Sequence, residues 1–157
     1  MQRNVLEYLE ATAPRLPDKV AFTNGEYSLT FGALSRAAKG IGTFLAQKGF
    51  CNEPVVVFME KHPCSVAAFF GVVYAGCYYV PIDEEMPRYR VELIFRNLNP
   101  RAVLCDEKTR PMIEEMGYSG GLFPYEQAAA CPAEEERLTA IRARQLDTDP
   151  LYIVFTS

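Results

Sequence analysis

The amino-acid sequence predicts an α/β fold: a mostly parallel sheet with flanking helices, preceded by a short N-terminal hairpin. Three observations predict it. Strand-like segments alternate along the chain with longer helical segments, as they do in β-α-β units with right-handed crossovers. Residues 55–59 form a continuous apolar run, which suits a strand covered on both faces of a parallel sheet. Asn24-Gly25 stands between two short apolar runs, a pattern typical of a hairpin turn.

The N-terminal segment predicts a short amphipathic helix followed by the hairpin. In residues 4–13 the apolar side chains fall on one helical face. Pro14 ends this helix, because proline cannot continue the backbone hydrogen-bond pattern. The two hairpin strands are expected at residues 20–22 and 27–29.

A longer helix is predicted over residues 31–48. Thr30 is the expected N-cap residue, since its hydroxyl can accept a hydrogen bond from an N–H of the first turn. Gly49 stands just after the helix, where glycine is favoured. The face expected to be buried has helical spacing and comprises Phe31, Leu34, Ala38, Ile41 and Leu45.

The middle of the chain predicts two strands joined by a buried helix. The strands are residues 55–59 and residues 78–80, and Pro81 is expected to end the second one. Between them, residues 64–74 are apolar around most of the helix circumference and follow Pro63, a residue that favours helix starts. The side chains expected to be largely buried in this region are Val56, Phe58, Phe69 and Phe70.

The rest of the chain continues the alternation. A turn is expected at residues 147–150. The expected helices are residues 87–98, 109–116 and 131–144, and the expected strands are residues 102–105, 122–123 and 151–155. We expect the strands at residues 55–59, 78–80 and 102–105 to be parallel neighbours.

The composition excludes several classes of protein. Hydrophobic residues make up 49% of the 157 residues and charged residues 23%, which is typical of a folded domain and not of a disordered or fibrous chain. The net charge of −4 argues against nucleic acid or an anionic membrane as a partner. The sequence also predicts no signal peptide and no membrane span, because it has no apolar run of sufficient length.

The cysteine and histidine content limits the chemistry of a site. The five cysteines are widely spaced and include no Cys-x-x-Cys pair, so no protein-built metal site is predicted. Their odd number, and the apolar stretches around Cys64, Cys77 and Cys105, are typical of a reduced, cytoplasmic protein. The single histidine, His62, precedes a proline and is expected to be a loop or N-cap residue.

Three motifs carry the functional information. The first is YSLTFGAL at residues 27–34, and the second is AGCYYVPID at residues 75–83, followed by Pro87 and Arg90. The third is DPLYIVFTS at residues 149–157. In this order they resemble the first three core motifs of the adenylate-forming enzymes, and most closely those of amino-acid adenylation domains and D-alanine–carrier-protein ligases. The resemblance extends over nearly the whole chain.

This sequence departs from the family pattern at several positions. Phe31 stands where the family usually has tyrosine, and Ala33 where it usually has glutamate. Cys77 and Tyr78 stand where small residues are usual, and Glu84 replaces a common proline. These departures leave the family resemblance intact but assign no particular substrate.

The resemblance implies a domain boundary and cofactors. Residues 1–157 are expected to be the N-terminal part of an AMP-binding domain, truncated at the start of its phosphate-binding loop. In the family, that loop wraps the phosphates of ATP with backbone N–H groups and hydroxyls. Thr156 and Ser157 are therefore the candidate cofactor-binding residues, and ATP and Mg²⁺ are the implied cofactors of the full-length enzyme. No catalytic residue is assigned, because the family's acid-selecting residues and catalytic lysine are expected beyond Ser157.

The resemblance also implies a reaction. Enzymes of this family join a carboxylic or amino acid to AMP and pass the acyl group to a thiol, on coenzyme A or on the phosphopantetheine of a carrier protein. The fragment itself is expected to be inactive. The residues leave open an alternative, a flavodoxin-like, non-catalytic binding or regulatory module. Asp83 and Asp106 are too few acids to favour a receiver-type Mg²⁺ site in such a module.

Overall fold

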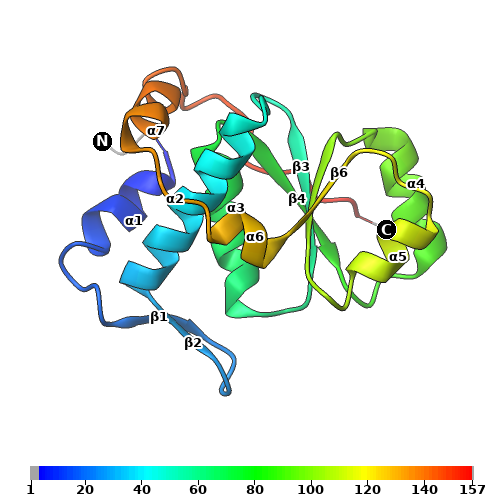
Figure 1. The fold of residues 1–157 in the computed structure, drawn as a ribbon, viewed down its shortest axis with the longest axis horizontal. Helices are drawn as coiled ribbons and strands as arrows, with labels where there is room; N and C mark the ends of the chain where they lie inside the picture. The colour runs from blue at the N-terminus through cyan, green and yellow to red at the C-terminus, as the bar shows by residue number, and fades with distance from the viewer. Residues whose placement is uncertain (1–3, 157) are drawn as a thin grey trace.

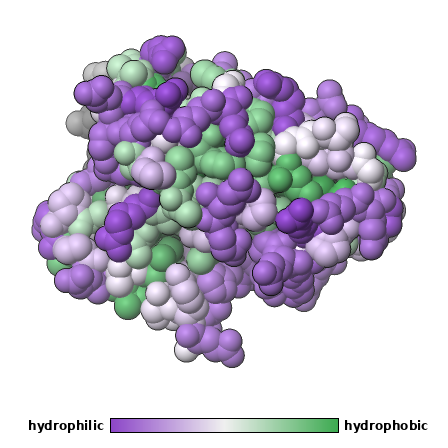
Figure 2. All heavy atoms as spheres, in the orientation of Figure 1, coloured by the Kyte–Doolittle hydropathy of each residue, from purple (hydrophilic) through white to green (hydrophobic). Residues whose placement is uncertain are grey.

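The computed structural model describes residues 4–156 as three layers, with a parallel sheet between two layers of helices (Figure 1). On the face drawn in Figure 2, apolar residues reach the surface over the middle of the molecule, between hydrophilic surfaces on either side. In chain order the elements are α1 (Leu6–Thr12), β1 (Val20–Thr23), β2 (Ser28–Thr30), α2 (Phe31–Gln47), β3 (Pro54–Met59), α3 (Pro63–Tyr74), β4 (Tyr78–Asp83), α4 (Arg88–Leu98), β5 (Ala102–Cys105), α5 (Arg110–Glu115), β6 (Gly121–Pro124), α6 (Tyr125–Ala129) and α7 (Glu135–Arg142).

The four-stranded sheet has the order β4-β3-β5-β6, and all its strands are parallel. The chain passes from β3 through α3 to β4 on one side, then returns through α4 to β5 on the other side. Because such crossovers are right-handed, this reversal moves the connecting helices to the opposite face. Hence α3 covers one face of the sheet, and α4 and α5 cover the other (Figure 1). The prediction of three neighbouring parallel strands is confirmed.

Strand β3 supplies side chains to both cores, which explains its continuous apolar run. Val55, Val57 and Met59 belong to the larger core under α2 and α3. Val56 and Phe58 belong to the smaller core under α4 and α5. Because successive side chains of a strand point to opposite faces, an interior strand with a helix layer on each side needs an apolar residue at every position.

Helices α2 and α3 approach closely through two glycines. A Cβ atom placed on Gly42 would lie 2.5 Å from the Cβ of Tyr74, and one placed on Gly71 would lie 2.5 Å from the Cβ of Ile41. No real Cβ atoms pack this closely, so each glycine permits the contact by having no side chain. The two helices can therefore bury their facing surfaces against each other.

The predicted core is mostly confirmed, with three exceptions. Leu34, Ala38, Ile41, Leu45, Val56 and Phe58 are buried. Phe31, Phe69 and Phe70 are only half-buried. Phe31 is the first residue of α2, so it lies at the edge of the core. Phe69 stacks on Tyr79 of β4, with ring centroids 4.6 Å apart, and β4 is the edge strand of the four-stranded sheet.

The predicted helix caps are present. The Thr30 hydroxyl accepts a hydrogen bond from the Ala33 N–H at 3.2 Å. The Nδ1 atom of His62 accepts one from the Cys64 N–H at 3.1 Å, so the single histidine is the N-cap residue of α3. Gly49 follows α2 with a φ of +84°, the left-handed conformation that glycine adopts at low cost.

The predicted hairpin forms, with a longer loop than Asn-Gly alone. Strands β1 and β2 are antiparallel, and Thr23 pairs with Ser28, so four residues connect them. The side-chain oxygen of Asn24 accepts hydrogen bonds from the N–H groups of Glu26, at 3.1 Å, and Tyr27, at 2.8 Å. The next residue, Gly25, has a φ of +95°.

Two predicted elements have clearly different bounds in the structure, and one helix has no counterpart among the predictions. Strand β4 does not end at Pro81 but continues to Asp83. The helix predicted over residues 131–144 is shorter and is limited to α7. Before α7 the backbone is not helical, because the Glu134 N–H donates a hydrogen bond to the Thr43 hydroxyl at 3.1 Å. Helix α6 was not predicted, and its burial of Tyr125 and Ala128 places it in the larger core.

Candidate functional site

The third motif lies along the outer edge of β4, beside Tyr79 near the start of that strand. The Tyr79 N–H donates to the Leu151 carbonyl at 3.2 Å, and the Ile153 N–H donates to the Tyr79 carbonyl at 3.0 Å. The rings of Tyr79 and Tyr152 stack with centroids 5.7 Å apart. The motif thus runs parallel to β4 and extends the sheet at its open side.

The predicted strand at residues 151–155 is wrong as a regular strand, because only one bridge forms, between Tyr79 and Tyr152. The next bond of a parallel ladder would need an N–H at residue 81 to donate to the Ile153 carbonyl. Residue 81 is proline and has no N–H. Proline is tolerated at position 81 because the nitrogen of this residue points away from β3 and takes no part in the hydrogen bonds between β3 and β4. It points to the side on which Tyr79 contacts the third motif.

Thr156 lies four residues beyond Tyr152, and the bridge between Tyr152 and Tyr79 directs this segment toward the carboxyl end of the sheet. Its side chain is exposed, and no hydrogen bond joins it to another residue of 4–156. The other candidate cofactor-binding residue, Ser157, lies outside the described residues.

Hydrogen bonds fix the turn after β5 to the end of β3. One oxygen of Asp106 accepts hydrogen bonds from the N–H groups of Lys108, at 3.1 Å, and Thr109, at 2.9 Å. Its other oxygen accepts one from the Glu60 N–H at 2.7 Å. The Thr109 hydroxyl donates to the Phe58 carbonyl at 2.5 Å. Both oxygens of Asp106 are therefore engaged by the chain itself.

The position of this turn is relevant to ligand binding. The sheet has the strand order of flavodoxin-like folds, whose ligands bind where the order reverses. Here that point lies at the carboxyl ends of β3 and β5. Lys108 also pairs with Glu60, with 2.9 Å between nitrogen and oxygen. The polar groups at this position thus serve the fold.

Asp83 ends the second motif and is fixed by two partners. It accepts a hydrogen bond from the Glu85 N–H at 2.9 Å and pairs with Lys61, with 3.0 Å between nitrogen and oxygen. The pKa of the Asp83 carboxyl is lowered, first by the Glu85 N–H and then by Lys61. Asp83 thus takes part in a turn hydrogen bond, and its charged partner is Lys61 rather than Arg90 of the same motif.

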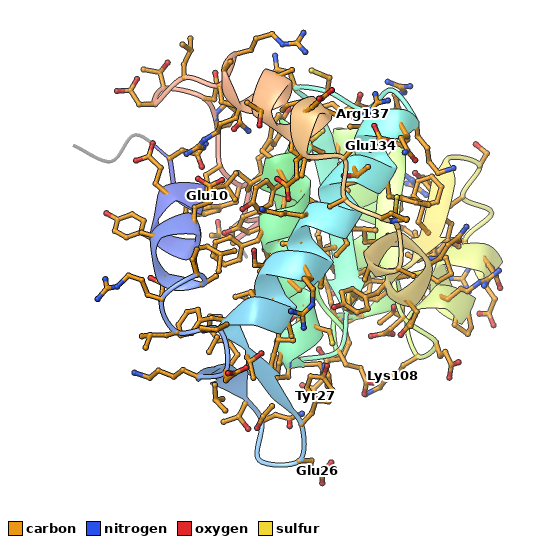
Figure 3. The ribbon with its side chains drawn as sticks, turned by 60° about the vertical axis from the view of Figure 1, so that its left-hand side comes forward. Glu10, Glu26, Tyr27, Lys108, Glu134 and Arg137 are labelled. Atoms are coloured by element: carbon orange, nitrogen blue, oxygen red, sulfur yellow. The ribbon has the colours of Figure 1, made fainter. Side chains whose placement is uncertain are left out.

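The hairpin carries the first motif to the same end of the molecule. The ring of Tyr27 lies 4.6 Å from the ring of His62, which follows β3. Figure 3 shows Tyr27 and Lys108 at this end. The first two motifs therefore meet at the carboxyl end of the sheet, and the third runs from Tyr79 toward it. Their separation in the sequence gives no direct sign of this arrangement. Sequence reasoning missed the stack of Phe69, Tyr79 and Tyr152 that links the second and third motifs.

Two further properties bear on the type of site. Within residues 4–156, no three or more histidine, cysteine, aspartate or glutamate side chains are grouped so as to hold a metal ion. None of the helices described is both long enough and apolar enough to cross a membrane.

The chain is similar to curated proteins that are much longer than it is. The chain is 30% identical to tyrocidine synthase 1 of Brevibacillus parabrevis over 161 residues, which cover 99% of this chain and 14% of that protein. It is 28% identical to the D-alanine--D-alanyl carrier protein ligase of Listeria welshimeri over 110 residues, 69% of this chain and 22% of that ligase. The chain therefore spans less than a quarter of the length of either relative.

Solved structures contain the same fold. The nonribosomal peptide synthetase FmoA3, in its α-methyl-L-serine-AMP-bound form, matches with a TM-score of 0.81 and 28% identity, over 96% of this chain and 16% of that one. A Mycobacterium tuberculosis fatty acyl CoA synthetase matches in fold, with a TM-score of 0.74 and 18% identity, over 99% of this chain and 33% of that one. The family described as AMP-binding enzyme matches residues 9–157. The chain therefore belongs to the AMP-binding enzyme family.

Proposed function

We propose that the chain is the N-terminal part of the AMP-binding domain of an ATP-dependent ligase that activates carboxylates. The ligase forms an acyl- or aminoacyl-adenylate and transfers the acyl group to a thiol. The match to the FmoA3 structure carries this proposal, because it extends over 96% of the chain at 28% identity to a protein bound to an aminoacyl-AMP. The similarity to a carrier protein ligase and to tyrocidine synthase 1 supports a carrier protein as the acceptor, with coenzyme A as the second possibility.

The position of Thr156 supports ATP as a cofactor of the full-length enzyme. Its exposed hydroxyl has no hydrogen bond to another described residue, and it follows a segment that runs parallel to β4 toward the carboxyl end of the sheet. A hydroxyl in this setting fits a contact with a phosphate oxygen. ATP supplies the AMP that activates the carboxylate, and Mg²⁺ offsets charge on the phosphates. We propose that Thr156 and Ser157 begin the loop that orients those phosphates.

Exposed apolar side chains support the proposed domain boundary. Tyr152 and Val154 are 54% and 55% exposed, respectively. Phe69 and Phe70, which are half-buried, line a small apolar cavity of about 120 Å³ with Tyr79. In a longer protein, the rest of the AMP-binding domain would cover this face. The five free thiols support a reducing, cytoplasmic location.

The flavodoxin-like module is the weaker candidate. It has the same strand order, but the acid at the reversal point, Asp106, accepts hydrogen bonds from its own turn and from Glu60. The family match over residues 9–157 favours the ligase.

Exchange of labelled pyrophosphate into ATP tests the proposal. An intact enzyme that contains this chain should catalyse the exchange when given its carboxylate, and a panel of small amino acids and fatty acids identifies which one. The 157-residue chain alone should give none, because removing even one donor to a developing charge can slow a reaction about 10²–10³-fold. No exchange by the intact enzyme across the panel would contradict the ligase. Exchange by the short chain would contradict the domain boundary.

A further inference from the structure

A polar groove lies at the amino end of the sheet, opposite the proposed ATP site. It has a volume of about 670 Å³. Phe50, Arg101 and Gly120, which line it, precede β3, β5 and β6 respectively. The turns at Asp83 and Asp106 lie at the carboxyl end, so the length of the strands separates them from the groove. The groove is therefore distinct from the region that the motifs approach.

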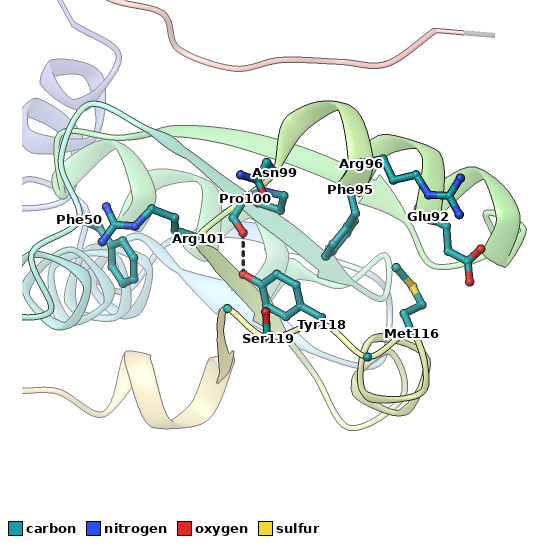
Figure 4. A pocket seen from close by; sticks show the side chains of 12 residues that line it. Phe50, Glu92, Phe95, Arg96, Asn99, Pro100, Arg101, Met116, Tyr118 and Ser119 are labelled. Atoms are coloured by element: carbon teal, nitrogen blue, oxygen red, sulfur yellow. Dashed lines mark hydrogen bonds between the residues drawn. The ribbon is translucent and has the colours of Figure 1, made fainter.

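Two aromatic rings form the rigid part of the groove. Phe95 of α4 and Tyr118 meet edge to face, with centroids 5.3 Å apart. The Tyr118 hydroxyl donates to the Pro100 carbonyl at 3.0 Å (Figure 4). Burial raises the pKa of this hydroxyl to about 12, so it remains protonated and keeps the bond. The ring thus provides a fixed apolar surface for a ligand.

The groups around these rings are mostly hydrogen-bond donors. The Arg96 side chain makes no hydrogen bond or ion pair with another residue of 4–156. In the loop before β6, the Gly121 N–H donates to the Arg101 carbonyl. The N–H groups of Ser119 and Gly120 have no such partner among the described residues. The groove therefore offers several unused donors, which favour a ligand that carries acceptors and negative charge.

The second cation of the groove is held in place. The Arg101 guanidinium lies over the Phe50 ring, 5.3 Å from its centroid, and pairs with Glu53 at 2.9 Å. Its side chain is still 65% exposed, so it can bind a further acceptor. The acid in the lining, Glu92, already pairs with Arg88 at 2.9 Å. Cationic groups thus outnumber unengaged acids at the groove.

The distribution of these groups indicates an extended ligand. In Figure 4, Arg101 lies near one end of the groove and Arg96 near the other, with Phe95 and Tyr118 between them. A ligand that contacts both arginines must therefore extend past the two rings. A peptide with separated carboxylates and an apolar side chain between them can do so, and its carbonyl groups can accept from Ser119 and Gly120.

We propose that this groove is a docking site for an acidic peptide segment of a partner protein. Charge complementarity identifies the partner's chemistry: carboxylates at Arg96 and Arg101, and an apolar residue against Tyr118. Arginine and tyrosine are also the residues that most often dominate binding energy at protein interfaces. The site requires no part of the chain outside residues 4–156.

Fluorescence polarisation tests the site with the full chain and a labelled short peptide of glutamate, leucine and glycine. Arg96→Glu and Arg101→Glu should each weaken binding about tenfold, since each replaces a charge-assisted contact with repulsion. Arg15→Glu is the matched control, because Arg15 is exposed and its side chain has no partner among the described residues. It should leave the affinity unchanged. The same peptide with lysine in place of glutamate should not bind.

Two further measurements keep the result unambiguous. The Arg96 side chain makes no hydrogen bond or ion pair within residues 4–156. The neutral variant Arg96→Gln, which puts no acid in the last turn of α4, should therefore keep a thermal unfolding midpoint close to that of the unmodified chain and still weaken binding, even if Arg101→Glu is less stable. In NMR titrations, the amides of Ser119 and Gly120 should shift with the peptide. Equal affinity in Arg96→Glu and Arg15→Glu, shifts confined to another face, or displacement of the peptide by an equal concentration of phosphate would overturn the proposal.

Discussion

Thr109 and Phe58 are joined by a hydrogen bond of 2.5 Å between the threonine hydroxyl and the phenylalanine carbonyl, across 51 positions of sequence. Thr109 is 3% exposed. The bond connects the carboxyl end of β3 to the turn that follows β5. In the same turn, the Asp106 carboxylate accepts a hydrogen bond from the Glu60 N–H. The two central strands are thus fixed to each other just where the sheet's strand order reverses.

Replacing this threonine should destabilise the chain. Thr109→Val keeps the shape of the side chain but leaves the buried Phe58 carbonyl without its donor. We expect a loss of about 1–3 kcal/mol in the free energy of unfolding, measured by urea denaturation. The matched control is Thr139→Val on the exposed face of α7, which should change stability by less than about 0.5 kcal/mol. Equal losses in the two variants would show that the hydrogen bond contributes nothing.

The contact between α2 and α3 reverses the usual effect of replacing glycine in a helix. Gly→Ala normally stabilises a helix by about 0.5–1 kcal/mol. In Gly71→Ala the new Cβ would lie 2.5 Å from the Cβ of Ile41, so the helices must separate. We expect a loss of about 1–3 kcal/mol, typical of overpacking.

Chemical denaturation measures this effect against a helix position without the contact. Asn97→Ala, at an exposed position of α4, should be neutral or slightly stabilising because alanine has the higher helix propensity. A stabilising Gly71→Ala would mean that the two helices are not in close contact.

Most of the fold could be predicted because its signals are local. Thr30 as a cap and Asn24-Gly25 as a turn depend on residues within a few positions of each other. The run at residues 55–59 indicates a strand covered on both faces without reference to its partners. The course of β4 through Pro81 could not be predicted, because it depends on which side of the strand faces β3.

The site is less predictable because it depends on contacts between distant segments. The motifs identify the family, but the pairing of Tyr79 with Tyr152 joins residues more than seventy positions apart. The groove at the amino end has no motif at all. Its donors come from the end of α4 and from a loop before β6, and only the fold brings Arg96 near Tyr118.

Stability at acidic pH should depend on Asp83. The pKa of this carboxyl is lowered from 3.8 in the folded chain by the Glu85 N–H and by Lys61. A lowered pKa contributes stability that is fully present above the unfolded value, near pH 4, and is lost as the pH falls through the folded value. Asp83→Asn should therefore give a smaller loss of stability below about pH 4.

Unfolding midpoints between neutral and acidic pH check this prediction. Asp18→Asn is the control, because Asp18 is exposed and has no hydrogen bond or ion pair with another described residue. Its pH profile should follow that of the unmodified chain. If the pH profile of Asp83→Asn also follows that of the unmodified chain, the contacts of Asp83 with Glu85 and Lys61 contribute nothing to the pH dependence of stability.

Supplying the missing donor at position 81 should extend the sheet along the third motif. In Pro81→Ala the new N–H faces the Ile153 carbonyl, the next acceptor of the ladder that begins at Tyr79. One added hydrogen bond is worth about 0.5–1.5 kcal/mol. Losing proline favours the unfolded chain by about 0.4–1 kcal/mol. Global stability should therefore change little.

The effect should instead be local, and amide hydrogen exchange measures it. The amide at position 81 in the variant should exchange about two- to tenfold more slowly than an amide without a hydrogen bond. This factor corresponds to the free energy of about 0.5–1.5 kcal/mol for one hydrogen bond. Pro150→Ala is the matched control, since it removes a proline just before the same segment without adding a donor to the ladder. It should leave the exchange of Ile153 unchanged. An unprotected amide at position 81 would mean that the third motif ends its pairing with β4 for a reason other than the proline.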